Sequence, residues 1–84
     1  MTIQARKMEI GETIRFSDFI ITSAFTKFGE TEVVAFADKD GEIFRKVFST
    51  ALAKFLRDKK DVSSVTLEKV IHDGEYKFNK YVAN

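Results

Sequence analysis

Apolar residues alternate with polar ones along most of this chain, and helical spacing occurs in only one segment. Within residues 50–60 the apolar side chains recur at three- and four-residue intervals, at Leu52, Phe55 and Leu56, which places them on one helix face. Successive parallel strands need a crossover of a dozen or more residues, and only this gap is long enough. We therefore expect a mainly β, antiparallel fold with one helix, whose N-terminus Ser49 or Thr50 can cap.

The first long strand, over residues 13–25, contains a break in its alternation. Ile14 and Phe16 fall on one face, and after Ser17 and Asp18 the pattern resumes in the opposite phase. A one-residue phase shift is what a β-bulge or a sharp bend produces. This strand is therefore expected to bend and to contribute to two sheets.

Turn residues divide the rest of the chain. Residues 24–30 are predicted as a loop with Gly29 at its turn, and residues 38–41 (Asp-Lys-Asp-Gly) fit a type I turn with glycine in the left-handed position. Asp73-Gly74 is the strongest two-residue hairpin signal. The strands between these turns are predicted over residues 31–37, 42–48, 62–71 and 75–82.

The resulting order is β-β-β-α-β-β over a single domain of residues 1–84. Five strands, a long bent first strand and one helix between the third and fourth strands describe the oligonucleotide/oligosaccharide-binding (OB) fold. The fold class predicted is therefore a five-stranded antiparallel OB-like barrel. A domain of 84 residues is long enough for one such core and too short for two.

Composition argues against several classes of function. The chain has no cysteine, which excludes disulfides, thiolate nucleophiles and cysteine-based zinc sites. His72 is the only histidine and sits beside the Asp73-Gly74 turn, and the four glycines form no phosphate-binding loop. No apolar run approaches the ~18 residues of a membrane span. We expect no enzyme, cofactor or metal site, no membrane association, and a cytoplasmic location.

A candidate binding surface lies on the hairpin that the turn at residues 38–41 closes. That turn predicts pairing of Ala35 with Phe44 and of Val33 with Lys46. One face then carries Phe44, Lys46 and Phe48 above small residues, as in a platform on which bases stack while lysine neutralises phosphate. The alternative is that Phe44 and Phe48 point into the core and Arg45 points outwards.

The predicted loop over residues 24–30 adds aromatic and basic side chains. Lys27 and Phe28 join the first and second strands, where OB folds contact their ligands. Phe28 is equally well explained as a lid that folds back on the barrel.

Alternation along the second hairpin predicts which of its side chains face the core. Pairing through Asp73-Gly74 sets Ile71 opposite Tyr76, and the predicted core face comprises Val65, Leu67, Ile71, Tyr76, Phe78 and Val82. Lys69 and Lys80 fall on that face too, so either they extend to the rim or a bulge shifts the phase. Lys77 and Tyr81 lie on the opposite face, where they extend the candidate site.

With these features the chain resembles the small single-domain OB-fold single-stranded DNA-binding proteins of bacteriophages. The features are the bent first strand, the loop with Lys27 and Phe28, the hairpin with Phe44, Lys46 and Phe48, the helix, and the terminal hairpin at Asp73-Gly74. The resemblance implies sequence-tolerant binding of single strands during replication, recombination or repair. It also implies a homodimer and, for a phage protein, the host cytoplasm.

A protein partner is the alternative. Fourteen basic and thirteen acidic residues give a net charge of +1, which is low for a binder of polyanions. Exposed phenylalanines flanked by charge also serve as interface hot spots. The same face would then belong to a small interaction module, such as a phage inhibitor of a host enzyme or a subunit of an assembly.

Overall fold

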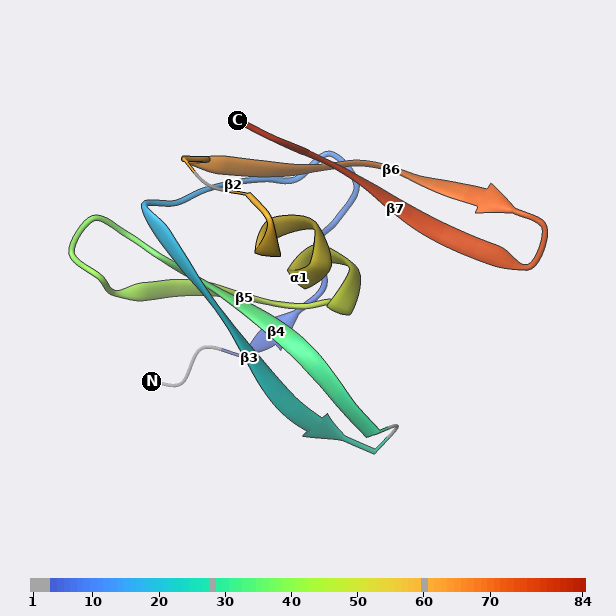
Figure 1. Cartoon of the computed structure of the whole chain (residues 1–84), viewed down its shortest axis with the longest axis horizontal. Helices are drawn as coiled ribbons and strands as arrows, with labels where there is room; N and C mark the ends of the chain where they lie inside the picture. The colour runs from blue at the N-terminus through green and yellow to red at the C-terminus, as the bar shows by residue number, and fades with distance from the viewer. Residues whose placement is uncertain (1–3, 28, 60) are drawn as a thin grey trace.

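Two sheets enclose the helix in the computed structural model, which describes residues 4–27, 29–59 and 61–84 (Figure 1). Over these residues one sheet has the strand order β1-β5-β4-β3 and the other β2-β6-β7. The elements are β1 (Ala5–Arg6), β2 (Thr13–Arg15), β3 (Asp18–Thr26), β4 (Gly29–Ala37), β5 (Ile43–Phe48), α1 (Thr50–Arg57), β6 (Ser64–Asp73) and β7 (Tyr76–Ala83). The prediction of a mainly β chain is confirmed. No helix in the part of the chain that the structure describes has the length and apolar character needed to cross a membrane.

The chain passes from one sheet to the other between β2 and β3. The Phe16 N–H donates to the Ser63 carbonyl at 2.9 Å, whereas the Ser17 N–H donates to the Ala37 carbonyl at 2.9 Å. Phe16 is buried and its ring lies 4.9 Å from that of Phe36. The predicted bend, at which the first strand contributes to both sheets, is confirmed.

The segment predicted as a loop, residues 24–30, is mostly strand. β3 continues to Thr26 and β4 starts at Gly29, and these two residues are paired. Gly29 has φ +112°, a conformation open to glycine but strained for other residues. The loop prediction was wrong because the chain reverses between Thr26 and Gly29. Phe25 and Glu30, which were predicted in the loop, therefore pair with each other in the β3–β4 ladder.

The β4–β5 hairpin has the predicted turn but a different register. Gly41 has φ +81°, and the Asp38 carboxylate accepts the backbone N–H of Glu42 at 3.0 Å. Ala35 pairs with Lys46 rather than with Phe44, and a bulge lies beside Ala37. The predicted register was therefore wrong by two residues.

The predicted faces of this hairpin survive, because a shift of two residues leaves every side chain on the same side. Val34, Phe36 and Val47 are fully buried and Arg45 is buried beside them, whereas Phe44 is exposed. The alternative in which Phe44 points into the core and Arg45 outwards is wrong.

Helix α1 begins as predicted and ends earlier. The Ser49 hydroxyl accepts the Leu52 N–H at 3.1 Å, which caps the helix. Leu52 and Leu56 are fully buried, and the helix that carries them lies between the two sheets (Figure 1). The helix ends at Arg57 with Asp58 as its C-cap, and position 60, the predicted end, lies outside the described residues.

A bulge in β6 decides which side chains of the β6–β7 hairpin are buried. The predicted pairing of Ile71 with Tyr76 was wrong, because Asp73 pairs with Tyr76 and Ile71 with Phe78, which places the turn at Gly74-Glu75. The register also shifts between Leu67 and Lys69. Val65 and Leu67 are buried as predicted. Beyond the bulge the faces are exchanged, so the prediction was wrong for a set of exposed residues: Ile71, Tyr76, Phe78 and Val82.

The same bulge changes the assignment of Tyr81 and of the two lysines. Tyr81 was predicted on the outer face, but it is 8% exposed and belongs to the core. Lys69 and Lys80 pair with each other and are exposed. Of the two explanations offered for these lysines, the bulge is confirmed.

The predicted five-stranded OB-like barrel with the order β-β-β-α-β-β is not confirmed. Among the described residues β5 pairs with β1, in parallel, and no strand pairing joins β5 to β7. Residues beyond β1 cross to the other sheet, where the Gly11 N–H donates to the Leu67 carbonyl at 2.7 Å and the Leu67 N–H to the Glu12 carbonyl at 3.1 Å. The N-terminal segment thus bridges an open seam between the sheets.

Arg45 holds this segment in place. Its Nη1 donates to the Lys46 carbonyl at 2.7 Å and to the Arg6 carbonyl at 3.3 Å, and its Nη2 donates to the Lys7 carbonyl at 3.2 Å. The Glu12 carboxylate lies 3.5 Å from Nη2. A single buried guanidinium therefore connects β5 to the chain that crosses the seam.

The sheet crossing generates a stability prediction. We expect Phe16→Ala to lower the free energy of unfolding by about 3–5 kcal/mol, because it opens a cavity against Phe36. Ile20→Ala is the matched control, because Ile20 is 53% exposed on the neighbouring strand, and we expect it to cost no more than about 0.5 kcal/mol. Urea unfolding measures both, and equal losses would contradict the assignment of the two faces.

Candidate functional site

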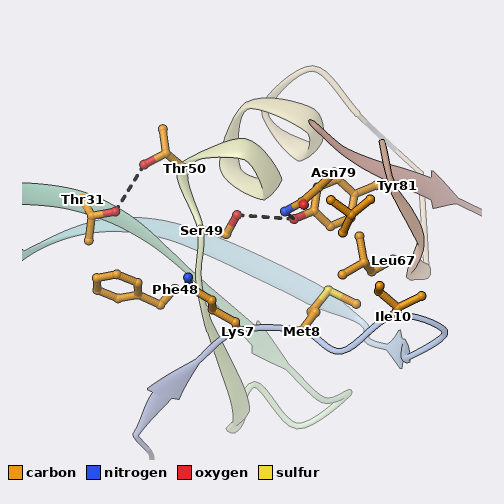
Figure 2. A pocket seen from close by; sticks show the side chains of 11 residues that line it. Lys7, Met8, Ile10, Thr31, Phe48, Ser49, Thr50, Leu67, Asn79 and Tyr81 are labelled. Atoms are coloured by element: carbon orange, nitrogen blue, oxygen red, sulfur yellow. Dashed lines mark hydrogen bonds between the residues drawn. The ribbon is translucent and has the colours of Figure 1, made fainter. Parts of the chain in front are cut away.

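A cleft opens at the seam between the β5–α1 junction and the β6–β7 hairpin (Figure 2). Its volume is about 420 Å³, within the range of roughly 300–1,000 Å³ typical of ligand sites. We call it the seam cleft, and its lining consists of Lys7, Met8, Ile10, Thr31, Phe48, Ser49, Thr50, Leu67, Val70, Asn79 and Tyr81.

The seam cleft exists because β5 loses its neighbour at its C-terminal end. β1 pairs with β5 only as far as the Arg6–Val47 pair. The chain then turns towards β6, and β7 approaches from the other side without pairing with β5. On the side of β1, Phe48 and Ser49 therefore border an opening, whereas on the other side Phe48 still pairs with Val33 of β4.

A short hydrogen-bonded chain stiffens one wall of the cleft. The Asn79 Nδ2 donates to the Tyr81 hydroxyl at 3.0 Å, and that hydroxyl lies 3.3 Å from the Ser49 hydroxyl (Figure 2). The Tyr81 ring also packs 5.6 Å from that of Phe55. Tyr81 is thus a buried wall residue, and its ring has no free face on which a base could stack.

The charged lining of the cleft is of one sign, positive. Among the described residues that line it, Lys7 is the one charged side chain and no carboxylate is present. Lys77 lies on the same face of β7 as Asn79 and Tyr81, because side chains alternate along a strand, and it is exposed near the hairpin turn. Within the cleft a negatively charged ligand would therefore meet Lys7 and no carboxylate among the described lining residues, whereas Glu9 and Glu12 border the hollow on the other side of Lys7.

The structure brings together only part of the predicted site. Phe48 is half-buried in the seam cleft, and Lys77 extends the wall that Tyr81 belongs to. Phe44 is 43% exposed and borders a separate, shallow hollow beside Asp38 and Lys39. Lys46 is half-buried and lies between Ala35 of β4 and Ala5 of β1.

The remaining predicted residues lie at the β3–β4 turn. Lys27 follows β3 directly and is exposed, whereas Phe28 falls outside the described residues. Phe25, two residues before Lys27, is 86% exposed.

Sequence reasoning missed five polar residues of the cleft: Lys7, Thr31, Ser49, Thr50 and Asn79. Lys7 belongs to an N-terminal segment without clear periodicity, and only the long-range contacts of Arg45 place it here. Asn79 alternates with Lys77 and Tyr81, whose face was predicted to be the outer one, an error that follows from the bulge in β6. The one local signal of that bulge was the presence of Lys69 and Lys80 on the predicted core face.

Within the described ranges, no three or more histidine, aspartate or glutamate side chains gather closely enough to hold a metal ion. Comparison with protein-family models, curated proteins and solved structures found no match. The geometry of the cleft is therefore the basis for proposing a function.

The wall of the cleft generates a second prediction. We expect Tyr81→Phe to lower the free energy of unfolding by about 1 kcal/mol, because it removes the hydroxyl that Asn79 and Ser49 share and keeps the buried ring. Tyr76→Phe is the control, because Tyr76 is 70% exposed, and it should leave the unfolding curve unchanged. A Tyr81→Phe curve that matches wild type would show that this network contributes nothing.

Proposed function

We propose that this chain binds single-stranded nucleic acid, with single-stranded DNA as the natural ligand, and that it does so without catalysis. The observation that carries the proposal is the composition of the seam cleft. Its lining includes Phe48 and Lys7 and, among the described residues, no carboxylate, in a chain whose acids nearly equal its bases in number. Lys77 continues this charge along β7.

The chemistry of the cleft suits a single strand. A base gains about 1–3 kcal/mol by stacking on an aromatic ring, and any base can do so. Lysine ammonium groups neutralise phosphates. Thr31, Thr50 and Asn79 supply hydroxyl and amide groups that can bond to sugars and base edges. The N-terminus of α1 also borders the cleft at Ser49, and its dipole favours a phosphate.

The order of the elements supports an OB-like assignment. The first long strand is divided between sheets as β2 and β3, followed by β4, β5, α1, β6 and β7. OB folds are partly open barrels that bind ligands across their second and third strands and the loops beside them. The counterparts here are β4, β5 and the turns of the β3–β4 and β6–β7 hairpins. Such a module would act in replication, recombination or repair, as in the phage proteins that the chain resembles.

A protein interaction module is the second candidate. Ile20 and Phe44 are exposed on the four-stranded sheet, outside the cleft. Binding of a nucleic acid in the cleft does not account for their exposure. A partner protein, an assembly subunit or a second copy of the chain would explain both residues. This alternative is favoured if no nucleic acid binds.

Binding to a labelled strand tests the proposal. Fluorescence anisotropy with oligo-dT, at several salt concentrations and with duplex DNA as control, should show affinity for the single strand that falls with salt. Phe48→Leu should weaken binding by about 5- to 150-fold, the equivalent of one lost base stack. Lys7→Gln should lower the salt slope by about 0.7.

Two variants on the same strand, β5, separate the cleft from the platform predicted on the sheet face. Phe44→Ala and Lys46→Gln should bind like wild type if the strand lies in the cleft, since neither residue lines it. Loss of affinity in these variants, with Phe48→Leu unaffected, would move the site to the sheet face. No binding of the wild-type protein at low salt would refute the proposed function.

A further inference from the structure

The β6–β7 hairpin exposes a second aromatic surface on the side away from the seam cleft. Tyr76, Phe78 and Ile71 are 70%, 52% and 41% exposed. The rings of Tyr76 and Phe78 are nearly parallel, with 6.4 Å between centroids and 27° between planes. We call this surface the outer hairpin face and define it by Ile71, Tyr76, Phe78, Lys69 and Lys80.

Two lysines face each other next to these rings. Lys69 and Lys80 are direct partners in the β6–β7 ladder, and like charges opposite each other destabilise a strand pair. The one acid recorded near them, Glu68, lies 3.7 Å from the Lys80 ammonium, a long and exposed ion pair of little value. An anion bound above the two lysines would remove this repulsion.

We infer that the outer hairpin face is a second contact surface for the same single strand, on which bases stack on Tyr76 and Phe78 and a phosphate sits at Lys69 and Lys80. The inference rests on the proposed function. It assigns to that function a ligand longer than the seam cleft alone accommodates. The combination of planar rings and paired cations matches a nucleotide, which has a planar base and an anionic phosphate.

Other occupants fit less well. A second copy of the chain, docked through the same face, would bring four lysines together, and of the acids that match them in number Glu68 lies beside Lys80 whereas Asp73 lies at the turn, paired with Tyr76. An acidic peptide would satisfy the lysines but gives no reason for two near-parallel rings. Charge and ring geometry together therefore favour nucleic acid.

The topology allows one strand to reach both surfaces. β7 is the edge strand of its sheet, in the order β2-β6-β7, and its alternate residues face opposite sides. Lys77 and Asn79 lie on the cleft side, and Phe78 and Lys80 on the outer side. A single strand that leaves the cleft along Lys77 can pass around the edge of β7 and continue over the outer hairpin face (Figure 1).

Strand length separates the two surfaces in an experiment. Oligo-dT of about 6 nucleotides, near the lower end of OB-fold site sizes, should occupy the cleft alone, whereas about 20 nucleotides should engage both surfaces. The double variant Tyr76→Ser/Phe78→Ser should weaken binding of the longer strand about 30-fold or more, because two stacks are lost. Its affinity for the short strand should equal that of wild type.

Three controls complete the design. Ile20→Ser removes an exposed apolar side chain from the other sheet and should change neither affinity. Phe48→Leu should weaken the binding of both the short and the long strand. Lys69→Gln/Lys80→Gln should lower the salt slope for the longer strand only, by about 1.4.

Each outcome decides between the proposals. If wild type binds both strands and the Tyr76→Ser/Phe78→Ser variant binds the longer one equally well, the outer hairpin face has no role and the proposed function stands. If wild type binds neither strand, both proposals fail. Labelled poly-glutamate is the parallel probe: binding that the double variant abolishes, with DNA binding unchanged, would overturn the inference and assign the face to an acidic protein segment.

Discussion

Everything in this fold depends on the point at which one extended segment leaves the first sheet and joins the second. Two successive backbone N–H groups, of Phe16 and Ser17, donate to different sheets. The buried Phe16 ring fills the corner that this crossing creates. Because β2 and β3 are covalently joined there, the sheets are held together at one corner, and the opposite margin between β5 and β7 is free to stay apart. The seam cleft is the consequence of this arrangement.

The open margin needs a separate device, and Arg45 supplies it. Its guanidinium lies against three backbone carbonyls and the Glu12 carboxylate, and in the described part of the chain its Nε has no partner. Burying a charge costs several kcal/mol unless it is well bonded. Arg45 therefore needs the carbonyls of Arg6 and Lys7 as hydrogen-bond acceptors, and the segment that carries these carbonyls needs Arg45 to hold it against β5. The segment that forms one side of the cleft is thereby tied to β5, and Lys7 is carried into the site.

The sequence predicts what depends on local pattern. The change of phase after Phe16, the cap at Ser49 and the turn at Gly41 are all visible in neighbouring residues, and all are confirmed. The faces of β4 and β5 are right even though their register is wrong, because an error of two residues preserves the side on which each side chain lies. A bulge is different, since one extra residue exchanges the faces of everything beyond it. The open seam cannot be predicted from local pattern, because it depends on contacts between Arg45 and residues nearly forty positions away.

The bulge at Glu68 also explains why aromatic side chains are exposed. Without it, Lys69 and Lys80 would lie in the core, and burying an unpaired ammonium costs several kcal/mol. With it, Tyr81 fills the core, and the hairpin exposes Tyr76 and Phe78, each of which forgoes roughly 1.5–3 kcal/mol of burial. Exposure of the rings is therefore the cheaper solution for the fold, whereas their near-parallel arrangement, with 27° between planes, is the feature that favours a planar ligand. The paired lysines are not explained in this way, because an uncharged residue in place of either lysine would leave the core undisturbed. They, rather than the rings, are the feature of this hairpin that calls for an anionic ligand.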